Sequence, residues 1–287
     1  MIDAGRLYRS LPVRELQVGD ASLPYCCHGG GPDLLLIHGF PLSGYTWRHL
    51  LPELARHHRC HVVDLAGLGD SRWRDDTDFT FTGHARRLKA MAEQLGLTRY
   101  DILAQDTGAT VARCLALLAP EHARRQVLIN TEIPGHRPPW IVEYQLLMRL
   151  PFTLAIFRQL LKSRTFLRSG MAFGGSFCEL DLIDGDFQRR FVQPLIEQPQ
   201  RLEGLKHYLL GIHWPTLDAL ATRHAELREA VLLLWGEEDR TFPLAQARQM
   251  LPQFHEAQLV SIPGTRLLPQ EEKPAAVIKA TLEFLGA

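Results

Sequence analysis

The fold of this chain is decided by the stretch Asp101-Ile102-Leu103-Ala104-Gln105-Asp106-Thr107-Gly108-Ala109-Thr110. An apolar run typical of a buried strand leads to Asp106, with Ala104 two positions before it and Gly108 two positions after it. Small residues at these positions allow a sharp strand-to-helix turn, which forces the side chain at its apex out at the edge of a sheet. The pattern predicts a nucleophile elbow. The alternative is that Asp106 is only the N-cap of the next helix, because Asp favours that position.

An Asp at such an apex has its own chemistry. A carboxylate is already ionised at neutral pH, so it needs no base for a first attack. This nucleophile suits displacement at a saturated carbon.

Short apolar runs alternate with longer amphipathic stretches around this segment, as is typical of βα units and a mostly parallel sheet. Eight strands are expected, at residues 14–18, 23–27, 34–38, 60–65, 99–104, 126–130, 230–235 and 258–262. Tight turns join the first three, so these can pair as an antiparallel meander. Later connections allow right-handed helical crossovers. Helices are expected at residues 47–56, 81–95, 109–118, 243–250 and 273–285.

Residues 134–228 break this alternation. Apolar and aromatic side chains, including Trp140 and Tyr144, recur there at helical spacing without a clear strand. The alternation resumes at Ala230, and the strands that follow need the earlier ones as partners. We therefore expect a core made of residues 1–133 and 229–287, with residues 134–228 inserted as a helical cap.

The composition excludes several classes of protein. The 287 residues are 46% hydrophobic and carry 32 Lys and Arg against 32 Asp and Glu, so neither nucleic acid nor a membrane is an expected partner. The apolar runs are far shorter than the ~20 residues that span a bilayer. The first residues show no secretory pattern, and a cytoplasmic location is expected. The tract His57-His58-Arg59-Cys60-His61 cannot converge on one ion, so no metal is expected.

A second motif is Leu34-Leu35-Leu36-Ile37-His38-Gly39-Phe40-Pro41, a strand that ends in an HGFP loop. Together with the elbow and residues 64–71, it resembles the α/β-hydrolase fold across nearly the whole chain. HGFP with an Asp elbow is most similar to soluble epoxide hydrolases and to haloacid and haloalkane dehalogenases. The resemblance implies an α/β fold with an eight-stranded, mostly parallel sheet flanked by helices and carrying an inserted helical cap.

The resemblance also implies roles for particular residues. Asp106 would be the nucleophile, and the N–H groups of Phe40 and Thr107 the oxyanion hole that stabilises charge on the ester intermediate. Asp239, in the loop after the seventh strand, would be the acid that orients a base, with Glu132 as a weaker substitute. Further residues are expected at the substrate pocket, namely His38 of the loop motif, Trp140, Tyr144 and Trp214.

The base of the family is missing. The run Pro269 to Pro274 fixes the register, and it places Arg266 where family members carry the catalytic His. A guanidinium stays protonated and cannot take a proton from water. Either an ester on Asp106 persists, or hydrolysis has been abandoned and Arg266 pairs with Asp106 or Asp239, or binds an anionic ligand. Replacement bases to consider are His136, His207 and His213.

Other family signals separate the subfamilies. Thr107 and Phe40 stand where haloalkane dehalogenases usually hold the halide with Trp and Asn, and Thr107 and Thr110 stand where fluoroacetate-type enzymes carry Arg. Epoxide hydrolases use cap Tyr hydroxyls as proton donors, and Tyr208 is the better match here, ahead of Tyr144.

The expected function is that of a hydrolase of the epoxide hydrolase or dehalogenase type. It would act on a small hydrophobic molecule without a cofactor, and ester hydrolysis would be impaired. The alternatives are a non-hydrolytic lyase or cyclase that uses the same pocket, and a catalytically silent ligand-binding protein. A homodimer is left open.

Overall fold

The computed structural model describes residues 4–287, in which nine strands form one sheet. The order along the sheet is β1-β2-β4-β3-β6-β7-β8-β9, and the short β5 pairs with β2. The strands are β1 Arg14–Val18, β2 Ala21–Gly29, β3 Asp33–Ile37, β4 Arg59–Val63, β5 Arg72–Trp73, β6 Tyr100–Gln105, β7 Ala123–Ile129, β8 Ala230–Gly236 and β9 Ala257–Ile262. From β4 to β9 neighbouring strands are parallel, whereas β1 and β2 run antiparallel to their neighbours.

All eight expected strands are present, and the α/β-hydrolase architecture is confirmed. The two-residue β5 was not expected. The antiparallel meander is wrong beyond its first pair, because β2 pairs with β4 and β3 lies between β4 and β6. Gly29 allows the chain to pass close to the turn before β4. It has a positive φ of 91° and packs against the turn before β4, so that a Cβ there would lie 2.3 Å from the His58 carbonyl oxygen. The chain therefore crosses that turn before β3 begins.

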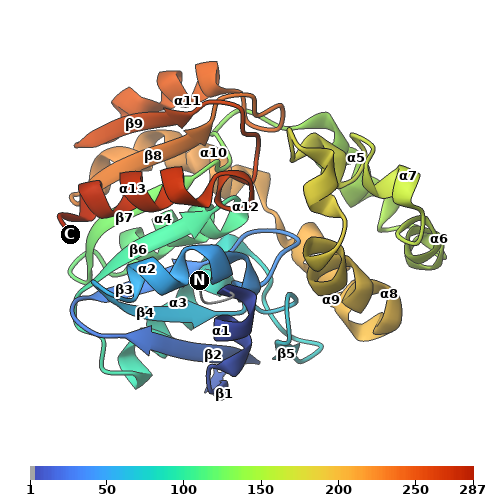
Figure 1. Ribbon diagram of the computed structural model, residues 1–287, viewed down its shortest axis with the longest axis horizontal. Coiled ribbons are helices and arrows are strands. Elements are labelled where there is room, and N and C mark those ends of the chain that lie inside the picture. Colours follow the sequence, from blue (N-terminus) through green and yellow to red (C-terminus); the bar gives the residue numbers. More distant parts are fainter. Residues whose placement is uncertain (1–3) are drawn as a thin grey trace.

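Alternating side chains of the strands supply two apolar cores, one on each face of the sheet. Leu34 and Leu36 belong to one core and Leu35 and Ile37 to the other, as the two-residue period of a strand requires. Figure 1 shows α13 lying over the sheet. The first core is covered by η1 Gly44–His49, α2 Leu51–Leu54 and α13 Pro274–Leu285, and the second by α3 Phe81–Gln94, α4 Thr107–Leu118 and α11 Leu244–Met250. The short α1 Ala4–Ser10 and α12 Pro269–Glu272 complete the core helices.

The chain between β7 and β8 contains helices and turns but no strand. Figure 1 shows α5 to α9 gathered at one side of the molecule, while α10 returns to the sheet. We call residues 134–228 the helical segment. Its elements are α5 Pro139–Leu147, α6 Thr153–Leu160, α7 Arg164–Leu167, η2 Phe173–Gly175, η3 Leu180–Ile183, η4 Gln188–Val192, α8 Gln193–Glu197, α9 Pro199–Gly211, α10 Trp214–Arg223 and η5 His224–Glu226. Among residues 4–287, no helix has the length and apolar character needed to cross a membrane.

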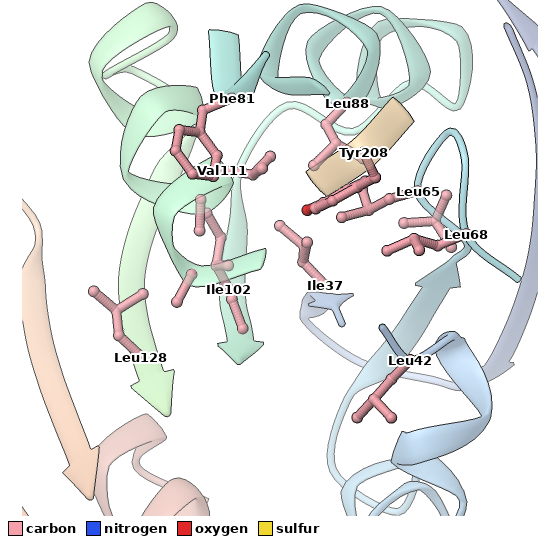
Figure 2. Close-up of a cluster of buried hydrophobic side chains, with 14 of the residues drawn as sticks. Ile37, Leu42, Leu65, Leu68, Phe81, Leu88, Ile102, Val111, Leu128 and Tyr208 are labelled. Atoms are coloured by element: carbon pink, nitrogen blue, oxygen red, sulfur yellow. The ribbon is translucent and has the colours of Figure 1, made fainter. Parts of the chain in front are cut away.

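The helical segment is joined to the core through Tyr208 on α9. Figure 2 shows this ring within a cluster of buried apolar side chains that includes Leu65, Leu68 and Leu88. Only 1% of Tyr208 is exposed. Burial of an aromatic side chain of this size contributes strongly to the packing of the two parts.

Candidate functional site

A strained backbone position lies between β6 and α4. Asp106 has φ 52° and ψ −133°, a conformation that non-glycine residues rarely adopt. It stands at the N-cap position of α4, but its side chain makes no capping hydrogen bond. The chain therefore turns sharply here, as the sequence predicts, and Asp106 lines a cavity.

Two glycines allow the neighbouring loops to approach this turn. A Cβ on Gly108 would lie 2.2 Å from the carbonyl oxygen of His38, and one on Gly39 would lie 2.5 Å from the Cβ of Asp106. No side chain fits in such gaps. The loop after β3 is thus held directly against the elbow.

This contact brings backbone amides to the Asp106 carboxylate. The Phe40 N–H donates to Oδ2 at 2.8 Å, and the amides of Phe40 and Thr107 both favour the ionised form. Burial opposes them and, together with the nearby Glu132 and Asp239, holds the pKa of Asp106 well above its usual range. The site therefore brings Asp106, Phe40 and Thr107 together and surrounds the carboxylate with both donors and like charges.

Asp106 opens onto a cavity of about 560 Å³ between the core and the helical segment. The core contributes Phe40, Thr107, Glu132, Arg240 and Arg266, and the helical segment contributes mainly apolar and aromatic side chains. Trp140, Tyr144 and Trp214, which the sequence analysis assigned to a substrate pocket, are among the residues that line this cavity. A cavity of this size and character suits a small apolar molecule.

His38 does not line this cavity, contrary to the sequence-based expectation. It is fully buried, its Nε2 accepts a hydrogen bond from the Leu65 N–H at 3.0 Å, and its Nδ1 lies 3.0 Å from the Gly39 carbonyl oxygen. Burial lowers its pKa, so the ring is neutral and can accept at one nitrogen while donating at the other. His38 joins the loop after β3 to the loop after β4.

Tyr208 also lies outside the cavity lining. Its hydroxyl donates to Thr107 Oγ1 at 2.9 Å, the same oxygen that accepts from the Phe40 N–H at 2.9 Å. Its ring stacks on Phe40 with 5.8 Å between the ring centroids. The sequence-based role of Tyr208 as proton donor to a substrate is thus not supported by its position. Tyr208 instead contacts the two residues beside Asp106, Thr107 and Phe40.

Asp239 is buried in a polar arrangement of its own. Its Oδ2 accepts from Asn130 Nδ2 at 2.6 Å and its Oδ1 accepts from the Thr241 N–H at 2.7 Å. Burial raises the pKa of Asp239 to about 6 in spite of these donors. Asn130, which has a positive φ of 35°, also accepts from the Gly236 N–H at 2.8 Å. Sequence reasoning assigned Asn130 no role, although an Asn directly after a strand suits the left-handed conformation.

Arg266 lies in the cavity wall without an acidic partner. Its Nη1 donates to the carbonyl oxygens of Gly174 and Phe177, each at 3.0 Å. Among residues 4–287 no carboxylate lies within ion-pair distance of its guanidinium, so it pairs with neither Asp106 nor Asp239. Arg266 instead connects the core to the helical segment.

A model of the "alpha/beta hydrolase fold" family matches residues 32–274. The chain belongs to the α/β-hydrolase fold family. Haloalkane dehalogenase 2 of Mycobacterium tuberculosis is 25% identical over 271 residues, covering 91% of each chain. Epoxide hydrolase 4 of Homo sapiens is 26% identical over 230 residues, covering 73% of this chain and 60% of that protein. The solved structure of the epoxide hydrolase CorEH, 21% identical, superposes with a TM-score of 0.81 over 96% of this chain and 99% of that one.

The protein is thus a hydrolase-fold enzyme related to haloalkane dehalogenases and epoxide hydrolases.

The cavity of this α/β-hydrolase holds a second buried carboxyl group, that of Glu132. Glu132 Oε2 accepts from the Thr110 hydroxyl at 2.5 Å, and the Thr131 hydroxyl lies 3.2 Å away. Within residues 4–287, no group donates a hydrogen bond to the other oxygen, Oε1. Only 4% of Glu132 is exposed, and burial raises its pKa. Glu132 and Asp106 both line the cavity, and the charge of Glu132 raises the pKa of Asp106.

A buried cation, Arg113, lies next to Glu132. Arg113 is fully buried, and its Nη2 donates to the hydroxyls of Thr110 and Thr131 at 2.7 and 2.9 Å and to the Glu132 carbonyl oxygen at 2.9 Å. Sequence reasoning missed Arg113. The available signal was that it is the only charged residue of an otherwise apolar helix, α4.

None of the replacement bases reaches the cavity lining. His136 Nε2 lies 2.8 Å from the Thr241 carbonyl oxygen, His213 Nδ1 lies 2.8 Å from the Thr216 hydroxyl, and His207 stacks on Phe79. In the described part of the chain, no group of three His, Cys, Asp or Glu side chains could hold a metal ion. In the tract before and within β4, His61 Nε2 contacts Asp33 at 2.8 Å.

Proposed function

We propose that the protein captures a small apolar electrophile, an epoxide or an alkyl halide, as an ester of Asp106. The observation that carries this proposal is the Phe40 N–H on Asp106 Oδ2 at 2.8 Å, at a strained turn that opens onto the cavity. The relatedness to haloalkane dehalogenases and epoxide hydrolases supports the same chemistry. Asp106 attacks a saturated carbon, and the bond from that carbon to the halide or to the epoxide oxygen breaks.

Glu132 supplies the proton that an opening epoxide needs. Burial raises the pKa of both carboxyl groups, and the charge of Glu132 raises the pKa of Asp106 further, so ionisation of both groups together is disfavoured. In the form that reacts with an epoxide, Asp106 is ionised and Glu132 is protonated. The Thr110 hydroxyl donates to Oε2 at 2.5 Å, and in the described part of the chain no group donates to Oε1, which leaves Oε1 to carry the proton. Transfer of this proton to the epoxide oxygen gives a neutral hydroxyalkyl ester and a Glu132 carboxylate.

In the hydrolysis of the ester that follows, Glu132 acts first as a base and then as an acid. Water attacks the Asp106 carboxyl carbon, its proton passes to Glu132, and the N–H groups of Phe40 and Thr107 stabilise the oxyanion. Collapse breaks the bond to the alkyl oxygen, which takes the proton back from Glu132, and Asp106 is regenerated. Arg266 cannot act as a base, and a carboxylate is a weaker base than an imidazole. We therefore propose that hydrolysis is slow, because a well-matched base contributes about 10²–10⁴-fold.

Intact-mass spectrometry tests this proposal with styrene oxide and bromohexane as probes. The wild-type protein should gain the mass of one probe residue, and the mass should revert slowly after the probe is removed. Asp106→Asn should gain nothing. Glu132→Gln should form the bromohexane adduct, but the rate at which this adduct decays should be at least tenfold lower. Glu143 is exposed, and Glu143→Gln should behave as wild type. No adduct together with no turnover would contradict the proposal and would favour a catalytically silent ligand-binding protein.

A second candidate is a lyase or cyclase that acts on an anionic molecule. Arg266 and Arg240 both line the cavity, and neither is paired with a carboxylate in the described part of the chain. A guanidinium fork suits two-point binding of a carboxylate or phosphate. This candidate predicts that Arg266→Gln weakens binding of a fatty acid measured by calorimetry, whereas the leading proposal predicts no loss.

A further inference from the structure

Exposed large apolar side chains gather on one short stretch of this protein. In the described residues, eight of the eleven such side chains lie between residues 142 and 171, on α5, α6 and the loops beside them. We call this surface the outer face, and its main members are Leu146, Leu150, Phe152, Ile156 and Leu160. Isolated exposed apolar residues are ordinary, but such a concentration on two successive helices and the turn between them indicates a surface that contacts another apolar phase or molecule.

The outer face lies directly behind the wall of the cavity. The same two helices present Tyr144, Met148 and Phe157 to the cavity, so α5 and α6 are apolar on both sides. Met171 belongs to both surfaces, because it lines the cavity and is 64% exposed. The outer face is therefore continuous with the cavity.

Phe152 is placed at the turn between α5 and α6 against its local preference. It has φ 65°, in the left-handed region that glycine or asparagine usually occupies, and 81% of it is exposed. Strain at a bulky residue persists where surrounding structure imposes it and is frequent at functional surfaces. The turn thus projects an aromatic ring into solvent.

The charge around the outer face is one-sided. Residues 139–168 contain five Arg or Lys and one Glu, although the whole chain balances 32 positive with 32 negative residues. Arg164 and Arg168 are paired with Asp184, but Arg149 and Lys162 make no ion pair in the described part of the chain. The neutral total, from which the sequence predicts no membrane partner, hides this local excess.

We propose that the outer face docks on an anionic phospholipid surface. The side chains of Phe152, Leu146 and Ile156 enter the interfacial layer, and Arg149 and Lys162 lie at the level of the phosphates. With 9 and 8 residues, α5 and α6 lie in the surface and do not span it. A second copy of this chain is a poorer occupant, because a shared interface would bring unpaired Arg149 and Lys162 of two copies together. Delivery of an apolar substrate past Met171 rests on the proposed function, whereas the docking itself does not.

Sedimentation with vesicles tests the docking on Asp106→Asn protein, so that failure of the chemistry cannot affect the result. Binding to vesicles of phosphatidylcholine mixed with phosphatidylglycerol should exceed binding to phosphatidylcholine alone by at least tenfold and should weaken with salt. Phe152→Ser with Ile156→Ser should lose at least tenfold. The matched control, Val13→Ser with Leu118→Ser, removes exposed apolar side chains elsewhere and should bind as wild type.

The contribution of charge is tested with Arg149→Glu combined with Lys162→Glu. This double substitution should abolish the preference for the anionic vesicles. Three results would each overturn the proposal: no binding to anionic vesicles, equal binding by Phe152→Ser with Ile156→Ser, or a solution dimer that these serine substitutions dissociate. Circular dichroism of each variant verifies that the fold is kept.

Discussion

The proposed chemistry depends on the balance between the ionised and the protonated form of one carboxyl group, Asp106. Burial and the neighbouring Glu132 disfavour the Asp106 carboxylate, while the amides of Phe40 and Thr107 favour it. The net result is a pKa well above the usual range of an Asp. Such a carboxylate is poorly stabilised in the free protein, which makes it a better nucleophile once it has lost its proton.

The first prediction at this scale concerns pH. In the proposed mechanism only the ionised Asp106 attacks, and bromohexane, unlike an epoxide, needs no proton from Glu132, so the rate of adduct formation with bromohexane should rise with pH. Glu132→Gln removes the like charge and should move this rise to lower pH. The measurement is the adduct rate by quenched mass spectrometry across a pH series. A rate that falls with rising pH, or a profile that Glu132→Gln leaves in place, would contradict the assignment.

A second prediction concerns the approach of the loops to the elbow. Gly108→Ala would place a Cβ 2.2 Å from the His38 carbonyl oxygen, and the backbone must shift to relieve the contact. We expect a loss of about 1–3 kcal/mol in the free energy of unfolding, together with loss of adduct formation. Gly30→Ala is the control, because a Cβ there meets nothing within 4 Å. Equal behaviour of the two variants in urea unfolding would show that the close approach is unimportant.

At the scale of elements, local patterns predicted most strands and the elbow, because periodicity and small residues act locally. The sequence could not place β3 between β4 and β6, since strand order depends on how the Gly29 turn packs against a distant segment. Contacts across the fold also decide the positions of His38 and Tyr208, whose hydrogen-bond partners Leu65 and Thr107 lie far along the chain. These two residues were assigned to the substrate by motif, and their burial removes them from it.

Helix α4 carries a prediction at this scale. The Thr110 hydroxyl donates to Glu132 and accepts from Arg113, so Thr110→Val removes both hydrogen bonds. We expect a loss of about 1–3 kcal/mol in the free energy of unfolding, and a further rise in the pKa of Glu132 that slows decay of the Asp106 ester at neutral pH. Thr110→Ser should restore both. Slow decay that persists in Thr110→Ser would mean that the hydroxyl is not the cause.

At the scale of the whole molecule, the cavity lies between the core and the helical segment, which are joined by several contacts. Tyr208 packs into the core from α9, and Arg266 reaches from the core to the carbonyl oxygens of Gly174 and Phe177. Arg266 thus helps to hold the two parts together.

This arrangement predicts a specific result for Arg266→His. An imidazole at this position can accept a proton from water, and the Asp106 ester should decay about 10²-fold faster or more. The loss of the two hydrogen bonds to the helical segment should lower the melting temperature, and Arg266→Gln should show the same lowering without faster decay. If the two variants have the same ester lifetime, residue 266 does not stand where a base could act.

The most direct measurement is the site of the covalent adduct. Protein incubated with styrene oxide or bromohexane is digested, and tandem mass spectrometry of the peptides locates the added mass. We predict a single modified residue, Asp106. Modification of a different residue, or an equal adduct in Asp106→Asn protein, would show that the carboxylate at the elbow is not the nucleophile.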